Sequence, residues 1–280
     1  MGDWLETYRG TVFRWEVDPN DHLTVAYYFA RIADAGAGLL AAVGLTAAAT
    51  PTADSFVRYQ RELRVGDIMH MESGVISVEL DALVLGHKLF DSGAGVLCTT
   101  VEQRVRLAAP LTPETRRAVE ARRVEWDGPA RERRPRPPGL AGFRDTARDI
   151  VGPVEVDISG GAALSHYIHR FSAANGHAIA AFGMTPAYMR AEHRGFSTFE
   201  FQLELGSPLH PGDGVRVRSG ILHVGNSSLR LLHVMTREPA GEVVATLEQS
   251  GVHFDQDARR PAPLPDVLRE RARALLVKDA

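Results

Sequence analysis

The sequence predicts an α+β protein built from two similar halves, each with one long helix on an antiparallel sheet. Three observations lead to this prediction. Long blocks of the first half align with blocks of the second half in the same order, each half contains one long apolar helix-like segment, and strand-like segments follow that helix. With 280 residues, of which 44% are hydrophobic, the chain is long enough to form two cores of ordinary size.

Three pairs of segments carry the repeat. The first two aligned ranges are 17–44 with 156–183 and 66–103 with 212–249. The third pair, "APLTPETRRAVEARR" and "APLPDVLRERARALL", reads in both halves as a helix with acidic residues near its start and basic residues near its end. Because the three pairs occur in the same order, we predict that the two halves share one fold.

Each half is predicted to contain a short strand, a long helix, several alternating strands and a closing helix. No residue from Ala35 to Ala53 is charged, but this segment is mainly Ala, Gly and Thr and contains Pro51, so it is too weakly apolar for favourable membrane insertion. We expect it inside a curled antiparallel sheet, which buries a helix on nearly every side. In the second half, apolar residues at every second position predict strands at 196–205, 214–224, 227–237 and 242–254.

The composition of residues 127–143 differs from that of the two halves. The segment "DGPARERRPRPPGLAGF" is rich in Pro, Arg and Gly and is typical of a linker. We therefore predict an N-terminal domain over residues 1–126, this linker, and a C-terminal domain over residues 144–280. The arginines of the linker could meet the phosphates of a cofactor, but a solvated basic linker is the favoured interpretation.

Charge and cysteine content exclude several classes of function. The net charge of -3 gives no general attraction for nucleic acid. Cys98 is the single cysteine, so no disulfide framework exists, and its strand-like surroundings favour a buried thiol. The N-terminal residues lack the apolar core of a signal peptide. We expect a cytoplasmic protein that binds neither nucleic acid nor membranes.

A polar cluster precedes the long helix of the first half. In "VDPNDHLTVAYY", residues 17–28, the side chains of Asp18, Asn20 and His22 occur at alternate positions. An Asp or Asn at this place is commonly only a helix cap or turn residue, worth about 1 kcal/mol. The corresponding residues of the second half are Asp157, Ser159 and Gly161. Because both helices need capping but only the aspartate is repeated, we predict one working site, in the first half.

Two segments of the first half resemble a known family. "DPNDHLTVAYY" resembles the Asp-x-Asn-Gly-His pattern, followed by tyrosine, of the hotdog-fold thioesterases, and "YQRELRVGD" (59–67) is similar to a strand of the same family. The sequence differs from the pattern at Asp21, where the family has glycine, and at Thr24, where it often has asparagine. With the repeat, the resemblance is to the tandem, or double hotdog, acyl-CoA thioesterases.

This resemblance implies two antiparallel sheets, each wrapped round a long central helix, that form an intramolecular pseudo-dimer. Related branches are the 4-hydroxybenzoyl-CoA-type thioesterases, those of carnitine and betaine breakdown, for which "TTVEQ" (99–103) is a further similarity, and the acyl-carrier-protein thioesterases. The implied substrate is an acyl thioester of coenzyme A or of a carrier protein. No other cofactor is implied. The implied assembly is a monomer with pseudo-dimeric halves, or a homo-oligomer of such monomers.

The chemistry of thioester hydrolysis assigns roles to the polar cluster. Asp18 would act as general base or nucleophile, while Asn20 and His22 would orient the water or thioester and pass a proton to the leaving thiolate. By the resemblance, Glu62 lies opposite the start of the helix, and the amide that polarises the carbonyl lies near Val25 or Ala26. The predicted substrate-binding residues are Thr24, Val25, Ala26, Tyr27, Tyr28 and Arg61.

Structural roles compete with several of these assignments. Glu62 could merely pair with Arg58 or Arg61 at a strand edge. Tyr27 and Tyr28 fit a core or a tunnel wall. The aligned residues His87 and His233 are predicted to be hydrogen-bonded structural histidines. No cluster of His, Cys and carboxylate residues has metal-ligand spacing.

Two other functions remain open on the sequence alone. The first is an enoyl-CoA hydratase or dehydratase on the same double fold, whose signature also begins Asp-x-Asn but places its histidine one position later than His22. The second is a non-catalytic protein that binds acyl thioesters. The shorter spacing in this chain favours hydrolysis.

Overall fold

The structure is a computed structural model that describes residues 2–278, and these residues fall into two compact units. The first unit runs to Ala130 and also takes in Val154–His166. The second unit contains Arg131–Pro153 and continues from Tyr167 to the C-terminal helix. The turn that precedes the long helix of the second half therefore belongs to the first unit.

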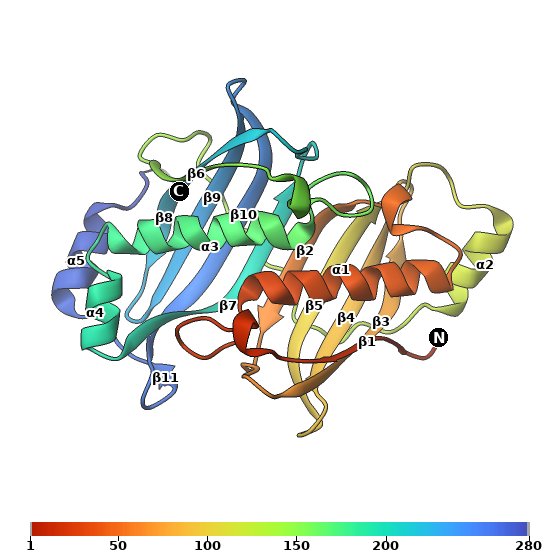
Figure 1. The fold of residues 1–280 in the computed structure, drawn as a ribbon, viewed down its shortest axis with the longest axis horizontal. Coiled ribbons are helices and arrows are strands. Elements are labelled where there is room, and N and C mark those ends of the chain that lie inside the picture. Colours follow the sequence, from red (N-terminus) through yellow and green to blue (C-terminus); the bar gives the residue numbers. More distant parts are fainter. Residues whose placement is uncertain (1, 279–280) are drawn as a thin grey trace. The chain divides into compact units, whose positions relative to one another are not determined.

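The first unit is an antiparallel sheet with one long helix against it (Figure 1). Its hydrogen-bonded strands follow the order β1-β3-β4-β5-β2. The strands are β1 (Leu5–Thr11), β2 (Thr52–Tyr59), β3 (Ile68–Val78), β4 (Ala82–Asp91) and β5 (Val96–Arg106). The helices are η1 (Arg14–Glu16), α1 (Val25–Ala42), η2 (Ala47–Ala49) and α2 (Pro113–Ala121), and η3 (Pro153–Glu155) precedes the second long helix.

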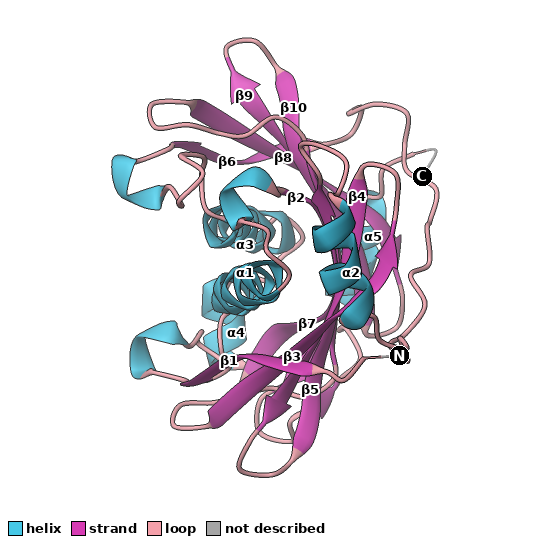
Figure 2. Ribbon diagram, turned by 90° about the vertical axis from the view of Figure 1, so that its right-hand side faces the viewer, coloured by secondary structure: helices cyan, strands magenta, loops and turns pink. Residues whose placement is uncertain are grey.

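Helix α1 packs against the sheet through small and branched apolar residues. Its C-terminal part joins a buried cluster formed by residues of α1, β3, β4, β5 and α2: Leu39, Leu40, Val43, Val75, Leu83, Leu85, Val105 and Val119. A Cβ atom at Gly36 would lie 2.6 Å from Gln103 Oε1, so glycine lets α1 approach β5 closely. In Figure 2 the strands of this unit curve beside α1. The uncharged segment 35–53 is not one helix, because α1 ends at Ala42 and Gly44 follows with φ of 76°.

The second unit repeats this plan. Its strands follow the order β7-β10-β9-β8-β6, and the short strand β11 pairs with β10. The strands are β6 (Arg144–Ile150), β7 (Arg194–Leu205), β8 (Gly214–Val224), β9 (Ser228–Glu238), β10 (Glu242–Asp255) and β11 (Arg260–Pro261). The helices are α3 (Leu164–Ala180), α4 (Pro186–Ala191) and α5 (Asp266–Ala274). Helices α2 and α5 are the pair of closing helices that the repeat predicts.

A buried chain of polar side chains is present in both units. In the first unit, His87 Nδ1 shares a hydrogen bond with Ser73 Oγ at 2.7 Å, and His87 Nε2–H donates to Gln103 Oε1 at 3.0 Å. The second unit has the same two contacts on His233, at 2.6 Å and 3.3 Å. A threonine lies at each end of both hydrogen-bonded rows. The row in the first unit is Thr7, Ser73, His87, Gln103 and Thr52, and the row in the second unit is Thr146, Ser219, His233, Gln249 and Thr198.

These histidines are structural, as the sequence predicts. Both are fully buried, and burial lowers the pKa of His87 and of His233 to about 4, against the smaller opposing effect of the glutamine hydrogen bond. Since all five positions correspond between the halves, the repeat extends to side-chain contacts and is not limited to backbone topology.

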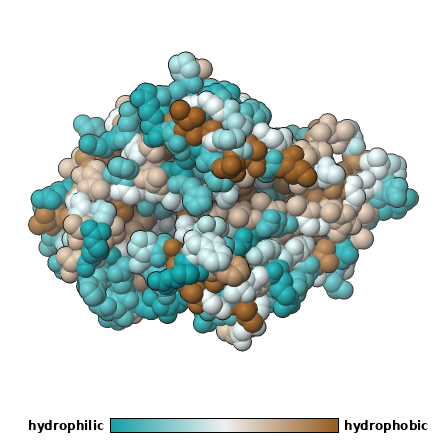
Figure 3. Space-filling model, in the orientation of Figure 1, coloured by the Kyte–Doolittle hydropathy of each residue, from teal (hydrophilic) through white to brown (hydrophobic). Residues whose placement is uncertain are grey.

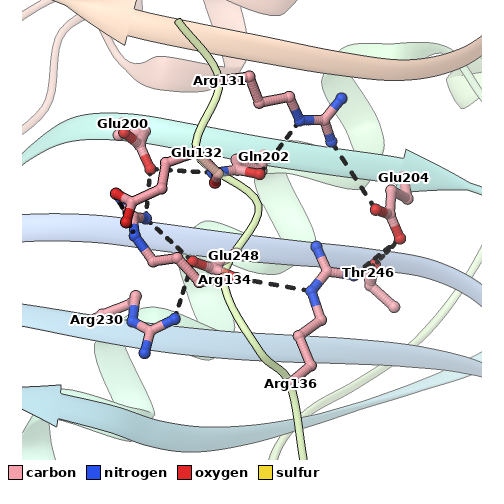
Figure 4. A network of polar contacts seen from close by, with 10 residues as sticks. All are labelled: Arg131, Glu132, Arg134, Arg136, Glu200, Gln202, Glu204, Arg230, Thr246 and Glu248. Atoms are coloured by element: carbon pink, nitrogen blue, oxygen red, sulfur yellow. Dashed lines mark hydrogen bonds and ion pairs between the residues drawn. The ribbon is translucent and has the colours of Figure 1, made fainter.

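Three of the four arginines in the predicted linker, residues 127–143, are held by acidic side chains. Residues 131–136, here called the arginine strap, lie against strands β7 and β10 of the second unit (Figure 4). Arg134 pairs with the buried carboxylates of Glu200 at 2.7 Å and Glu248 at 3.1 Å, and Arg136 pairs with Glu204 at 2.8 Å. The sequence interpretation of solvated arginines is therefore wrong for Arg131, Arg134 and Arg136, because β7 and β10 present acidic and polar side chains to them.

The surface carries hydrophobic residues in small groups. On the face drawn in Figure 3, hydrophobic side chains form separate clusters among hydrophilic ones. Within residues 2–278, no helix combines the length and apolar character needed to cross a membrane. The same residues contain no group of three or more His, Cys, Asp or Glu side chains arranged to hold a metal ion.

Candidate active site

Residues 17–23 form a closed turn around the carboxylate of Asp18, here called the Asp18 turn. Asp18 Oδ1 accepts hydrogen bonds from the backbone N–H groups of Asn20 at 2.8 Å and His22 at 3.1 Å. Asp18 Oδ2 accepts a third from Asn20 Nδ2 at 3.2 Å. The backbone N–H of Asp18 donates to the His22 carbonyl at 2.8 Å, and an antiparallel bridge between Val17 and Leu23 closes the turn. The three polar residues of the cluster are thus brought together.

Asp21 occupies the left-handed position of this turn. Its φ is 61°, a conformation that glycine adopts at little cost and other residues rarely adopt. The corresponding Gly160 has φ of 78°. Asp21 therefore adopts the left-handed backbone conformation for which the family pattern has glycine. Its carboxylate pairs with Arg64 at 2.7 Å and Arg14 at 3.5 Å, two contacts that a glycine could not make.

Glu62 lies beside His22, although 40 residues separate the two in the sequence. Glu62 Oε2 is 2.7 Å from His22 Nε2, and the side chains are 29% and 11% exposed. The backbone N–H of Leu23 donates to the carbonyl of Leu63 at 2.7 Å, which joins the Asp18 turn to the loop after β2. Glu62 therefore contacts His22 across the space between the Asp18 turn and the loop after β2.

Two residues that the sequence analysis missed fix the turn to helix α1. Glu16 is 3% exposed, accepts the backbone N–H of Phe13 at 2.9 Å and pairs with Arg31 of α1. The Glu16 carbonyl also accepts the backbone N–H of Thr24 at 2.8 Å. A signal was present in the repeat, because Glu16 aligns with a glutamate and Arg31 with an arginine of the second half, Glu155 and Arg170.

Helix α1 begins directly after the turn, with Thr24 as its N-cap residue. The backbone N–H groups of Tyr27 and Tyr28 donate to the Thr24 carbonyl, at 2.8 Å and 3.4 Å. The N–H groups of Val25 and Ala26 precede this first hydrogen-bonded turn, so the helix geometry gives them no acceptor within the helix. They lie at the positive end of the helix dipole, next to the polar cluster.

The predicted substrate-binding residues differ in their surroundings. Tyr28 is 4% exposed, its ring meets Tyr59 edge-on at 5.1 Å, and burial raises the pKa of both phenols. Its phenol also hydrogen-bonds to the backbone of Leu63, so Tyr28 supports the loop that carries Glu62. Tyr27 is half-buried, Arg61 is exposed, and the Arg61 N–H donates to the Cys98 carbonyl at 3.1 Å. Cys98 is buried, as predicted, and burial raises the pKa of its thiol.

The second half repeats the backbone of the turn but not its side chains. Asp157 Oδ1 accepts the backbone N–H of Ser159 at 2.8 Å, and the Asp157 N–H donates to the Gly161 carbonyl at 2.9 Å. A bridge between Val156 and Ala162 closes this turn as well. The aspartate therefore has a structural role in both halves. What distinguishes the first half is the pair of His22 with Glu62 and the side chain of Asn20.

Comparison with solved structures establishes the fold. An acyl-ACP thioesterase from Bacteroides thetaiotaomicron VPI-5482 matches with a TM-score of 0.66 and 12% identity, over 87% of this chain and 96% of that chain. The 12:0-ACP thioesterase from Umbellularia californica matches with a TM-score of 0.66 and 12% identity, over 89% of this chain and 94% of that one. Among curated proteins, none matches the sequence. At this identity the structural likeness shows the hotdog-type thioesterase fold alone.

The sequence itself matches a family over both halves. The sequence model of the thioesterase-like superfamily matches residues 12–127 and again residues 151–272, which together make up most of the chain. The first match includes the Asp18 turn and Glu62, and the second includes the Asp157 turn. The chain therefore belongs to the thioesterase-like superfamily and is an enzyme that hydrolyses thioesters.

Proposed function

We propose that the chain hydrolyses an acyl thioester, most directly an acyl-CoA, at the Asp18 turn of the first half. The observation that carries this proposal is the contact of His22 with Glu62 beside Asp18, which has no counterpart at the Asp157 turn. The named acyl-ACP thioesterases of similar fold make a carrier-protein thioester the alternative substrate.

The wider arrangement is part of the same proposal. We infer a double hotdog in which the halves predicted as residues 1–126 and 144–280 each wrap a sheet round a central helix and pair as an intramolecular pseudo-dimer, with residues 131–143 of the intervening segment assigned to the second unit. The match of the family over both halves supports this arrangement. A monomer of this kind in the cytoplasm, or a homo-oligomer of it, is the form that we propose.

The first step of the proposed reaction is attack by water on the thioester carbonyl carbon. Glu62 accepts the hydrogen on Nε2 of His22 and so orients the imidazole, while the carboxylates of Glu62 and Asp18 are the available bases. A carboxylate has about four acceptor positions, of which Asp18 uses three on the turn, so it can still accept a water. As the C–O bond forms, the base takes one proton from the water.

The second step is collapse of the tetrahedral intermediate. The N–H groups of Val25 and Ala26 at the start of α1 would donate to its oxyanion, where the helix dipole is also favourable. The C–S bond then breaks, the thiolate leaves, and the proton held by the base passes to it by way of Nδ1 of His22, because Nε2 already carries the hydrogen that Glu62 accepts. The products are a free acid and a free thiol, and no other reactant is needed.

A matched pair of variants tests the site. Asp18→Asn keeps an oxygen for the two backbone N–H groups of the turn but removes the negative charge, and Asp157→Asn makes the same change in the second half. We expect Asp18→Asn to lower kcat for acyl-CoA hydrolysis by about 100-fold or more while Asp157→Asn stays at the wild-type rate. Release of free thiol from a panel of acyl-CoAs measures both.

Circular dichroism of both variants checks that each turn still folds. Equal activity of the two variants would refute the assignment of the site to the first half. Hydration of an enoyl-CoA without thiol release would refute hydrolysis itself.

A further inference from the structure

Two aromatic rings are exposed immediately before the Asp18 turn. Phe13 is 46% exposed and Trp15 is 71% exposed, and their rings stack with centroids 4.7 Å apart at an interplanar angle of 4°. An exposed tryptophan leaves a large apolar area in water, which gives folding no benefit. The two parallel rings instead form a flat surface directly before the Asp18 turn in the sequence.

Cationic side chains accompany this surface. Arg14 lies between the two aromatic residues in the sequence, and its side chain is 80% exposed. Arg64 is 48% exposed. Both guanidinium groups contact the single carboxylate of Asp21, at 3.5 Å and 2.7 Å, so the group of three carries a net positive charge. We call Phe13, Trp15, Arg14 and Arg64 the aromatic platform.

The repeat shows that the fold does not require the platform. In the second half, Gly152, Pro153 and Val154 stand in place of Phe13, Arg14 and Trp15, yet η3 forms there as η1 does in the first half. The exposed stack and its arginines therefore occur only in the half that carries the pair of His22 and Glu62. This coincidence links the platform to the active site and not to folding.

We propose that the aromatic platform binds the nucleotide part of coenzyme A, with the adenine ring stacked on Trp15 and the phosphates held by Arg14 and Arg64. A purine stacks favourably on an exposed aromatic face, and guanidinium groups recognise phosphate oxygens by paired hydrogen bonds. The pantetheine arm separates the nucleotide of acyl-CoA from its thioester, so a nucleotide site is expected outside the reacting centre. A carrier protein presents no adenine, so the platform selects coenzyme A as carrier.

This inference rests on the proposed function, and a comparison of two substrates tests it. One substrate is an acyl-CoA and the other is the same acyl group on pantetheine, which lacks the nucleotide. We expect Trp15→Ala to raise the ratio of KM for acyl-CoA to KM for acyl-pantetheine about tenfold, consistent with one lost stacking contact. Val154→Ala is the matched control, because Val154 is exposed at the corresponding position of the second half.

Binding of adenosine 3',5'-bisphosphate, measured by calorimetry, separates the platform from turnover. Wild-type protein is expected to bind it, Val154→Ala to bind it equally, and Trp15→Ala to bind it about tenfold more weakly. An unchanged KM ratio together with unchanged binding in Trp15→Ala would overturn the platform even if Asp18→Asn abolishes hydrolysis. Binding that depends on Trp15 would support it even if the Asp18 experiment fails.

Discussion

The carboxylate of Asp18 has one structural function, and the proposed reaction gives it a second. Oδ1 holds the turn through two backbone N–H groups, as Asp157 Oδ1 holds the N–H of Ser159 in the second half. Oδ2 accepts a hydrogen bond from the side-chain amide of Asn20 at 3.2 Å. In the proposed reaction, this is the oxygen that accepts the water. A neutral asparagine therefore preserves the first function and removes the second.

The pair of Glu62 with His22 gives a second test at this scale. Glu62→Gln keeps an acceptor for His22 Nε2 but removes the negative charge beside the imidazole. We expect kcat to fall by about 100-fold with little change in KM. Steady-state rates over a range of substrate concentrations measure both quantities.

Glu6→Gln is the control for that change, since Glu6 is an exposed glutamate that pairs with Arg9. If Glu62→Gln kept the wild-type kcat, the pair would be a contact without a part in proton transfer.

The spacing of Asp18, Asn20 and His22 was visible in the sequence, and the resemblance placed Glu62 opposite the start of the helix, but the contact of Glu62 with His22 was not predicted. No local pattern encodes the hydrogen bond between the Leu23 N–H and the Leu63 carbonyl, and that bond brings Glu62 to the turn. The role of Tyr28 was hidden for the same reason, because its contact with Leu63 depends on how α1 packs beside the loop.

At the scale of elements, the joint between η1 and α1 decides where the turn sits. Glu16 and Arg31 are 4% and 15% exposed in their side chains, so they form a nearly buried ion pair. Phe13 and Thr24 reach the same glutamate through backbone hydrogen bonds. One residue therefore connects the segment before the turn, the end of the turn and the helix.

Breaking this pair is expected to be costly. Glu16→Gln leaves Arg31 without its counter-charge in a nearly buried position, for which the loss of stability is about 3 kcal/mol. Urea denaturation measures this loss. The exposed pair of Arg9 with Glu6 is the control, and Arg9→Gln should leave the midpoint unchanged. A similar response of the two variants would mean that the Glu16 pair acts as an ordinary surface contact.

Elements with a strong period were predictable, whereas short ones were not. The alternating strands of the second half and the closing helices α2 and α5 occur where the sequence places them. Helix α4 was missed, since its six residues, from Pro186 to Ala191, are too few to show a helical period. The end of α1 was obscured by the uncharged residues that follow it, although Gly44 was the signal for a stop.

At the scale of the whole molecule, the two buried polar chains predict how stability depends on pH. The pKa of His87 and of His233 is lowered to about 4 in the folded protein, so the unfolded chain binds protons at higher pH than the folded one. Stability is therefore full above pH 6.5 and falls as the pH drops toward 4. Within this window each pH unit costs about 1.4 kcal/mol per histidine.

Urea denaturation at a series of pH values measures this slope. His223→Gln is the control, because His223 is exposed on β8 and its loss should leave the slope unchanged. An unfolding free energy that stays constant between pH 6.5 and 4.5 would contradict the buried, neutral state of both histidines.

The duplication itself was the part of the whole molecule that the sequence revealed most fully, because corresponding residues recur in order over both halves. The arginine strap was not foreseen. Its composition is that of a solvated linker. The strap is held on the sheet by acidic residues of β7 and β10, which lie more than 60 residues further along the chain and so leave no local signal.

The strap also determines how the protein could be divided. A fragment that starts at residue 144 would lose Arg131, Arg134 and Arg136. The carboxylate of Glu200 on β7 would then lack its counter-charge, Arg134. Dissection of the chain for expression of its second part should therefore begin ahead of Arg131. A fragment boundary chosen from the proline-rich composition alone would remove the arginines that neutralise the acidic residues of β7 and β10.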